Sequence, residues 1–307
     1  MKTLVCVIRR NTKLFFKDKG MFFTSLITPL ILLLLFVTFL GNIYRESFHA
    51  SIPEGMVVPE SLIEGFVGGW LFSSLLAVCC VTVAFCSNML MVQDKATGAR
   101  GDLTVAPVKR STLALGYYIS TVLSTLIICV IAMGACLIYL SQVGWYLTAQ
   151  YVLLTLLDVF LLVLFGTALS SVINYFLSTQ GQIAAVGTIV SSCYGFVCGA
   201  YMPISQFSEG IQKFISFLPG TYGTALLRNH LMNGVLDELQ TNYFPEEIVN
   251  GIRDSFDSNL YFFDHQVGIM QMYLVLGASV VVLIAVYVLL NMIKGKKKYK
   301  STTLASN

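Results

Sequence analysis

The stretch VGGWLFSSLLAVCCVTVAFCSNMLMV, residues 67–92, decides the class of fold because it contains no charged side chain. A helix of about 20 residues is long enough to cross the roughly 30 Å hydrocarbon core of a bilayer. Other apolar runs of near or above that length lie at 21–41, 112–140, 151–173, 182–200 and 267–293. We therefore expect an all-α integral membrane protein with six transmembrane helices.

The composition of the whole chain agrees with this expectation. Of its 307 residues, 56% are hydrophobic and 11% are charged, and the mean hydropathy is +0.77. Soluble domains carry about 25% charged residues, so folding alone would not remove this much apolar surface from water. Bilayer lipid must solvate a large part of the chain.

The distribution of Lys and Arg predicts the orientation. Residues 1–20 hold six of the 19 basic residues, 93–111 hold four and the tail at 294–307 holds five, whereas 42–66 and 201–266 together hold four. Short basic segments are retained on the cytoplasmic side of a membrane. Six spans with both termini in the cytoplasm satisfy this pattern, and the basic tail then faces anionic lipid.

Three segments outside the apolar runs have patterns of their own. Residues 2–19 mix apolar and basic side chains, which favours a helix lying in the membrane interface. Residues 93–110 are polar and short, and fit either a short helix that contacts a soluble protein or an ordinary loop. Residues 201–266 begin with apolar side chains at helical spacing up to Leu218, which predicts one helix that Pro219-Gly220 ends. The acidic remainder predicts a small extracellular cap.

Asp158 is the one ionisable residue inside a predicted span. A carboxyl group at that depth is costly unless it is protonated, paired or facing water, so it is a candidate for a substrate or proton role. A hydrogen bond to a neighbouring Ser or Thr is the simpler alternative. The eight Cys residues show no ligand spacing and fit small apolar packing residues better than a metal or redox site.

Motifs for catalysis or nucleotide binding are absent from the sequence. It contains no HExxH, no GxSxG and no GxxxxGK[ST] phosphate loop, and we place its three His residues in the expected outer segments. We expect no enzyme activity and no cofactor in this chain. If ATP powers its function, another chain must bind the nucleotide.

The order of these parts, with three local sequences, resembles the permease subunits of type-2 ABC exporters. The three sequences are RRNTKLFFKDKGMFFTSLITPLILLLLF at 9–36, QDKATGARGDLTVAPVKR at 93–110 and GFVCGAYMPISQFSEGIQKFISFLPGTYGTALLR at 195–228. The resemblance implies an elbow helix at 1–20, a coupling helix within 93–110, and a re-entrant hairpin and extracellular cap at 201–266. These parts and the spans make up one permease domain over 1–307.

The resemblance also implies site residues. Asp94, Gly98 and Pro107 match the spacing of the family's coupling helix, although Gly101 stands where many members have Glu. The contacts expected toward an ATPase are Arg9, Arg10, Asp94, Lys95, Gly98, Asp102, Leu103 and Pro107. The candidates for the translocation route are Asp158, Cys198, Met202, Pro203, Phe207 and Pro219, and the first, second and fifth spans would line the route and the dimer seam.

The implied complex contains two permease chains, identical or related, and two ATPase chains that bind ATP and Mg²⁺. It would sit in the plasma membrane of a bacterium and export an amphipathic small molecule, a lipid-like compound or a peptide from the cytoplasm or inner leaflet, with no role for nucleic acid. Two other classes remain open. A secondary transporter or channel would need intramembrane charges or repeated broken helices. A membrane scaffold or sensor would keep the topology but bind no ATPase.

Overall fold

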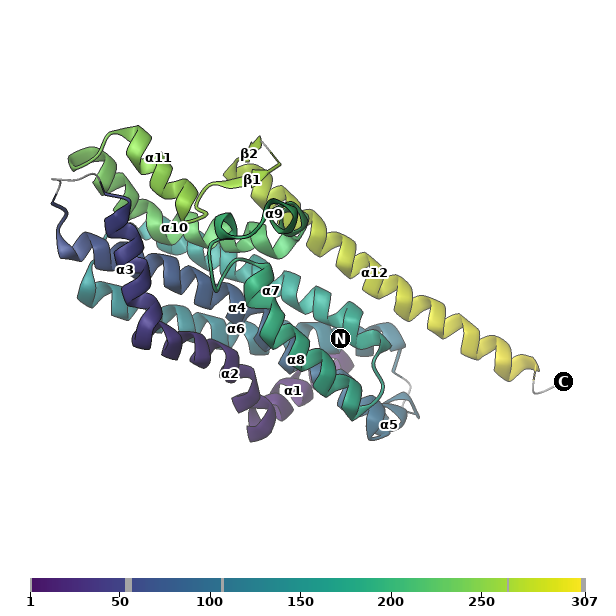
Figure 1. The fold of residues 1–307 in the computed structure, drawn as a ribbon. Helices are drawn as coiled ribbons and strands as arrows, with labels where there is room; N and C mark the ends of the chain where they lie inside the picture. Colours follow the sequence, from purple (N-terminus) through teal and green to yellow (C-terminus); the bar gives the residue numbers. More distant parts are fainter. Residues whose placement is uncertain (1, 53–56, 106–107, 264, 305–307) are drawn as a thin grey trace.

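The computed structural model describes residues 2–52, 57–105, 108–263 and 265–304, except the side chains of Thr104 and 294–304. Over these residues the fold is a bundle of helices with one pair of antiparallel strands, β1 (Leu260–Phe262) and β2 (His265–Val267). Figure 1 shows α1 (Lys2–Lys17) and α5 (Ala99–Val105) at one end of the bundle, and α3 (Gly41–Ala50) and α11 (Glu246–Ser255) at the other. We call these the α5 end and the α11 end.

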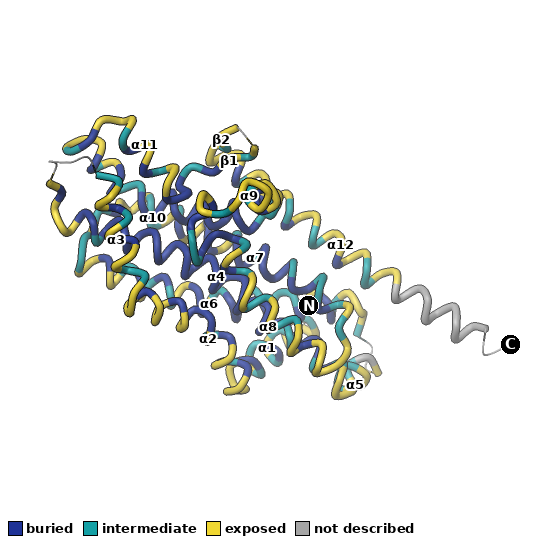
Figure 2. The backbone as a smooth tube through the Cα atoms, viewed as in Figure 1, coloured by how far each residue is buried: buried dark blue, intermediate teal, exposed yellow. Residues whose placement is uncertain are grey.

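The centre of the bundle is α4 (Glu60–Ala96), which contains the stretch 67–92. Its most apolar window is 94% buried, and Figure 2 shows this buried path through the middle of the molecule. The helix is apolar all round and rich in small residues, which let neighbouring backbones approach closely in a membrane protein. A side chain at Gly69, for example, would place its Cβ 2.8 Å from the Leu231 carbonyl oxygen.

Within the described residues, five helices are long and apolar enough to cross a membrane. They are the continuous helix over Lys19–Ala50, α4, α6 (Arg110–Val143), α7 (Ala149–Phe176) and the Ile269–Ile293 part of α12 (Ile269–Leu304). The first comprises α2 (Lys19–Leu35), the π-helical η1 (Phe36–Leu40) and α3, so it runs well beyond the predicted 21–41. The predicted fifth span corresponds to α8 (Gln180–Val197), whose 18 residues include polar ones and which is not among the five.

The N-terminal segment is a separate amphipathic helix, α1, which packs against α6. Val7 and Phe15 are buried, and the Val7 side chain fills the space beside Gly116 of α6. The chain turns at Asp18, whose carboxylate accepts a hydrogen bond from the Met21 N–H at 3.1 Å and so caps α2. The side of α1 that carries Val7, Asn11 and Phe15 therefore faces the bundle, while Val5 and Phe16 stay exposed.

The segment 201–266 differs most from its prediction. The single helix expected over the apolar repeat is divided into η2 (Ile204–Gln206) and α9 (Glu209–Ser216). Pro219 then begins a new helix, α10 (Pro219–Asn242), because proline fits the first helical turn, where its missing N–H costs nothing. Most of α10 is buried against α4, α7 and α12, so the part of the expected cap before residue 243 belongs to the bundle.

Candidate functional site

The end of α4 that adjoins α5 is joined to two other helices through Asp94. The Asp94 carboxylate accepts bidentate hydrogen bonds from Arg10 of α1, at 2.7 Å and 3.0 Å, and a third from the Tyr117 hydroxyl of α6, at 2.5 Å. Asp94 is 5% exposed. Its carboxylate raises the pKa of Arg10 above the usual value, so the guanidinium stays charged. Both residues were predicted to contact an ATPase. In the structure they contact each other, and the ATPase contact stays a prediction.

The next residue, Lys95, joins the same end of α4 to α7. Its Nζ donates to the carbonyl oxygens of Asn174 at 2.8 Å, Tyr175 at 2.9 Å and Leu177 at 2.9 Å. These are terminal carbonyls of α7, where a cation also interacts favourably with the helix dipole. We call Arg10, Asp94, Lys95 and Tyr117 the inner junction.

The short helix α5 follows the inner junction directly. Gly98 adopts a φ of +84°, a left-handed conformation that ends α4 and redirects the chain. Asp102 and Val105 are exposed, whereas Leu103 packs on a small apolar cluster that includes Val7 and Tyr117. The remaining coupling candidates are Arg9, which is exposed on α1, and Pro107, which lies outside the described residues.

A groove of about 900 Å³ runs between α2, α4 and α8. These three helices correspond to the first, second and fifth predicted spans, which the family resemblance assigns to the route. Its wall is mainly apolar, with Ile27, Ile31 and Phe196 among its residues, and its polar groups are uncharged, such as Thr24, Gln180, Thr188 and Ser191. A smaller cavity that shares Thr24, Cys86 and Met89 continues it toward Asp18 and Gln93.

None of the six predicted translocation residues lines this groove. Cys198 and Pro219 line a separate apolar cavity of about 340 Å³ between α7, α8, α10 and α12. Pro203 is buried and Met202 and Phe207 are half-buried in the segment that follows α8. Asp158 lies in the interior of the bundle, away from the groove wall.

Asp158 is paired with a histidine and a tyrosine from distant parts of the sequence. His230 Nδ1 of α10 lies 2.5 Å from one carboxylate oxygen, and the Tyr273 hydroxyl of α12 donates to the other at 2.7 Å. The expectation that all three histidines occupy outer segments is therefore wrong for His230, which is 3% exposed. The Ser or Thr partner considered for Asp158 is replaced by this cross-helix network.

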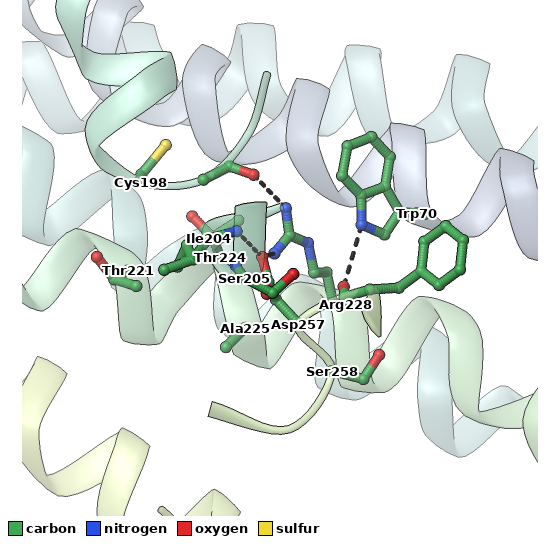
Figure 3. Close-up of polar contacts among 12 residues, drawn as sticks. Trp70, Cys198, Ile204, Ser205, Thr221, Thr224, Ala225, Arg228, Asp257 and Ser258 are labelled. Atoms are coloured by element: carbon green, nitrogen blue, oxygen red, sulfur yellow. Dashed lines mark hydrogen bonds and ion pairs between the residues drawn. The ribbon is translucent and has the colours of Figure 1, made fainter. Parts of the chain in front are cut away.

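Nearer the α11 end, Arg228 of α10 is buried and paired with Asp257, in the loop after α11, at 3.0 Å (Figure 3). Its guanidinium also donates to the Gly199 carbonyl after α8, and its central carbon lies 4.9 Å from the Trp70 ring centroid of α4. Burial raises the pKa of Asp257, while Arg228 and the backbone N–H groups of Ile204 and Ser205 oppose that shift. We call Trp70, Gly199, Arg228 and Asp257 the outer cluster.

Neither the outer cluster nor the buried position of His230 was predicted from the sequence. A signal was present in Arg228-Asn229-His230, three consecutive polar residues in a segment of small and apolar ones. Successive helical residues point about 100° apart, so three neighbours in sequence contact three different parts of the bundle. Arg228 reaches Asp257, Asn229 donates to the Ser258 carbonyl at 2.6 Å, and His230 meets Asp158.

Comparison with protein families gives one match, to the model described as ABC-2 type transporter, over residues 3–232. A comparison with curated proteins finds no match. The family match covers most of the chain, from α1 through the first part of α10, and so includes the inner junction, the groove and Arg228. The chain therefore belongs to the ABC-2 type transporter family, and it is a multi-pass membrane permease subunit of an ABC transporter.

Proposed function

We propose that this permease works in an ATP-driven exporter, in which a partner ATPase acts on the bundle through α5. The inner junction is the observation that carries the proposal. It fixes the end of α4 to α1, α6 and α7 immediately before α5 begins. A displacement of α5 would therefore move four helices together, because packed helices exchange between discrete arrangements rather than bending continuously.

The surface of α5 supports the same assignment. Its exposed residues Gly101, Asp102 and Val105 point away from the bundle, and Val105 is 88% exposed. Exposed apolar side chains beside charged ones at the end of a bundle suit contact with a soluble subunit. Arg9 and Lys13, exposed on the neighbouring α1, would add positive charge to that contact surface.

In the proposed complex, two permease chains face two ATPase chains, which bind ATP and Mg²⁺. The chain crosses the plasma membrane six times, with α8 as the fifth span and both termini in the cytoplasm. The groove between α2, α4 and α8 is the proposed route. Since its polar wall groups are uncharged hydroxyls and amides, an elongated, uncharged or weakly polar amphipathic molecule fits its chemistry.

The test is affinity purification of the tagged chain in mild detergent, followed by identification of co-eluting chains and an ATPase assay. We expect a stoichiometric ATP-binding subunit.

Replacement of Leu103 by Asp is expected to uncouple ATP hydrolysis from export without preventing membrane insertion, because it places a charge on the apolar contact beneath α5. A matched replacement of exposed Val57 by Asp serves as the control. Purification of the chain without any ATPase, or normal export by Leu103→Asp, would contradict the proposal.

The Asp158, His230 and Tyr273 network favours a second candidate, transport driven by protons without ATP. Ionisable residues buried between membrane helices are typical of proton pathways. Reconstituted vesicles distinguish the two functions: ATP alone should drive export in the first case, and an imposed pH gradient alone should drive it in the second. The inner junction beside an exposed short helix favours the first.

A further inference from the structure

The groove ends, toward α11, at Phe196 and Tyr201. Phe196 is in the last turn of α8, and Tyr201 follows in the segment 198–206, which runs from the end of α8 through η2. The Tyr201 carbonyl accepts a hydrogen bond from Tyr44 of α3 at 3.0 Å, and the Tyr44 ring lies 4.1 Å from the Trp70 ring. This end of the groove is therefore joined to the outer cluster.

Arg228 holds the segment 198–206 at its beginning. One guanidinium nitrogen donates to the Gly199 carbonyl and another to Asp257, while Trp70 covers the guanidinium face (Figure 3). Gly199 has a φ of +71°, and a side chain there would collide with Ile204. The turn at Gly199 thus brings the Gly199 carbonyl close to Arg228 of α10. Any residue with a side chain would disfavour this turn.

Asp257 holds the same segment at its end. Its carboxylate accepts hydrogen bonds from the backbone N–H of Ile204 at 2.5 Å and of Ser205 at 3.3 Å. Asp257 itself has a φ of +53°, a conformation that residues other than Gly adopt mainly where surrounding contacts impose it. One ion pair therefore fixes both ends of the segment at the end of the groove.

A buried ion pair adds little net stability compared with apolar side chains of the same size, but removing one partner leaves an uncompensated charge. The Arg228–Asp257 pair therefore acts mainly by selecting one arrangement of segment 198–206, and it adds little to the stability of the fold. The pair holds segment 198–206 through a few hydrogen bonds, from Arg228 to the Gly199 carbonyl and from the N–H groups of Ile204 and Ser205 to Asp257. A movement of the segment would break these bonds together. The same movement would take Tyr201 away from the end of the groove.

Building on the export function proposed above, we propose that Arg228 and Asp257 lock segment 198–206 over the outer end of the groove. The groove opens outward only when Arg228 releases the Gly199 carbonyl and Asp257 releases the N–H groups of Ile204 and Ser205. Arg228 and Asp257 are positioning residues for this closure and do not contact the cargo.

Cys198 provides a native reporter for the lock. It adjoins Gly199 and is 1% exposed. In a background with the exposed Cys6 and Cys193 replaced by Ser, a membrane-impermeant maleimide added outside should label Cys198 slowly. Arg228→Gln should accelerate this labelling by about 100-fold, because loss of one partner of a buried ion pair shifts a local opening equilibrium by that order. Asp257→Asn, which keeps the size of the side chain, should accelerate it in the same direction.

The matched control is Arg253→Gln. Arg253 contacts Asp237 and Asn233 near the same end of the molecule but does not contact segment 198–206. In Arg253→Gln, Cys198 should be labelled at the same rate as in the unsubstituted chain. In Arg228→Lys, which keeps a positive charge, Cys198 should be labelled more slowly than in Arg228→Gln. All variants are compared in the full-length chain in cell membranes, after monodisperse elution in detergent establishes that each is folded.

Unchanged protection of Cys198 in folded Arg228→Gln and Asp257→Asn would overturn the lock. Faster labelling in Arg253→Gln to the same extent would also overturn it, because the effect would then belong to the whole outer region. The same assay, run on the ATPase complex, separates this inference from the function. Labelling that rises on addition of ATP supports both; faster labelling in the variants with no response to ATP supports the lock and contradicts ATP-driven export.

Discussion

Replacement of Asp94 by Ala should weaken the bundle by about 2–4 kcal/mol of unfolding free energy. Two costs contribute. The buried Tyr117 hydroxyl, in a residue that is 2% exposed, loses its acceptor, which costs about 1–3 kcal/mol. The bidentate pair with Arg10 is lost as well, but the Arg10 side chain is 33% exposed, so solvent screening limits this part to about 1 kcal/mol.

Asp94→Asn should lose only about 1 kcal/mol, because the amide oxygen still accepts a hydrogen bond from Tyr117. The assay is reversible unfolding in mixed micelles, followed by the fluorescence of the two tryptophans. Asp102→Ala is the matched control, since that carboxylate is exposed on α5 and its loss should change stability by less than about 0.5 kcal/mol. Equal unfolding free energies for Asp94→Ala and Asp102→Ala would refute the reasoning.

Other substitutions test the remaining contacts by the same unfolding assay or by amide exchange. Asp158→Ala should cost about 3–5 kcal/mol, because the buried imidazole of His230 and the half-buried phenol of Tyr273 lose their shared acceptor, whereas Asp158→Asn should cost less; equal losses would contradict the network. Gly69→Ala should cost about 1–3 kcal/mol, since its Cβ would lie 2.8 Å from the Leu231 carbonyl. Gly181→Ala is its control and should not lose stability, since the added Cβ would meet no neighbouring segment within 4 Å. Lys95→Met should speed amide exchange in the last turn of α7, and unchanged exchange there would argue against the capping role.

Sequence reasoning succeeded where a pattern is local. Long apolar runs identified the helices that correspond to α2, α4, α6, α7 and α12, because the length needed to cross a bilayer is a property of the segment itself. The polar stretch 93–110 does contain a short helix, and a helix boundary does lie just before Pro219, which begins α10. Local composition also predicted the amphipathic helix before the first span.

The same reasoning failed where partners are distant in sequence. It did not identify Arg10 and Tyr117, which lie on other helices, as partners of the Asp94 carboxylate. The contact of Asp94 with an ATPase stays a prediction. His230 was assigned to an outer segment, but α10 is shielded from lipid by its neighbours and needs no apolar surface of its own.

The sequence by itself determined that this chain is a membrane protein, where its principal spans lie, and which transporter family it belongs to. These properties depend on the order and length of segments. Only the tertiary structure decided which polar groups meet: Arg10 with Asp94, Arg228 with Asp257, and Asp158 with His230. A buried charge must find a partner in three dimensions, and helix packing, which no local pattern encodes, selects that partner.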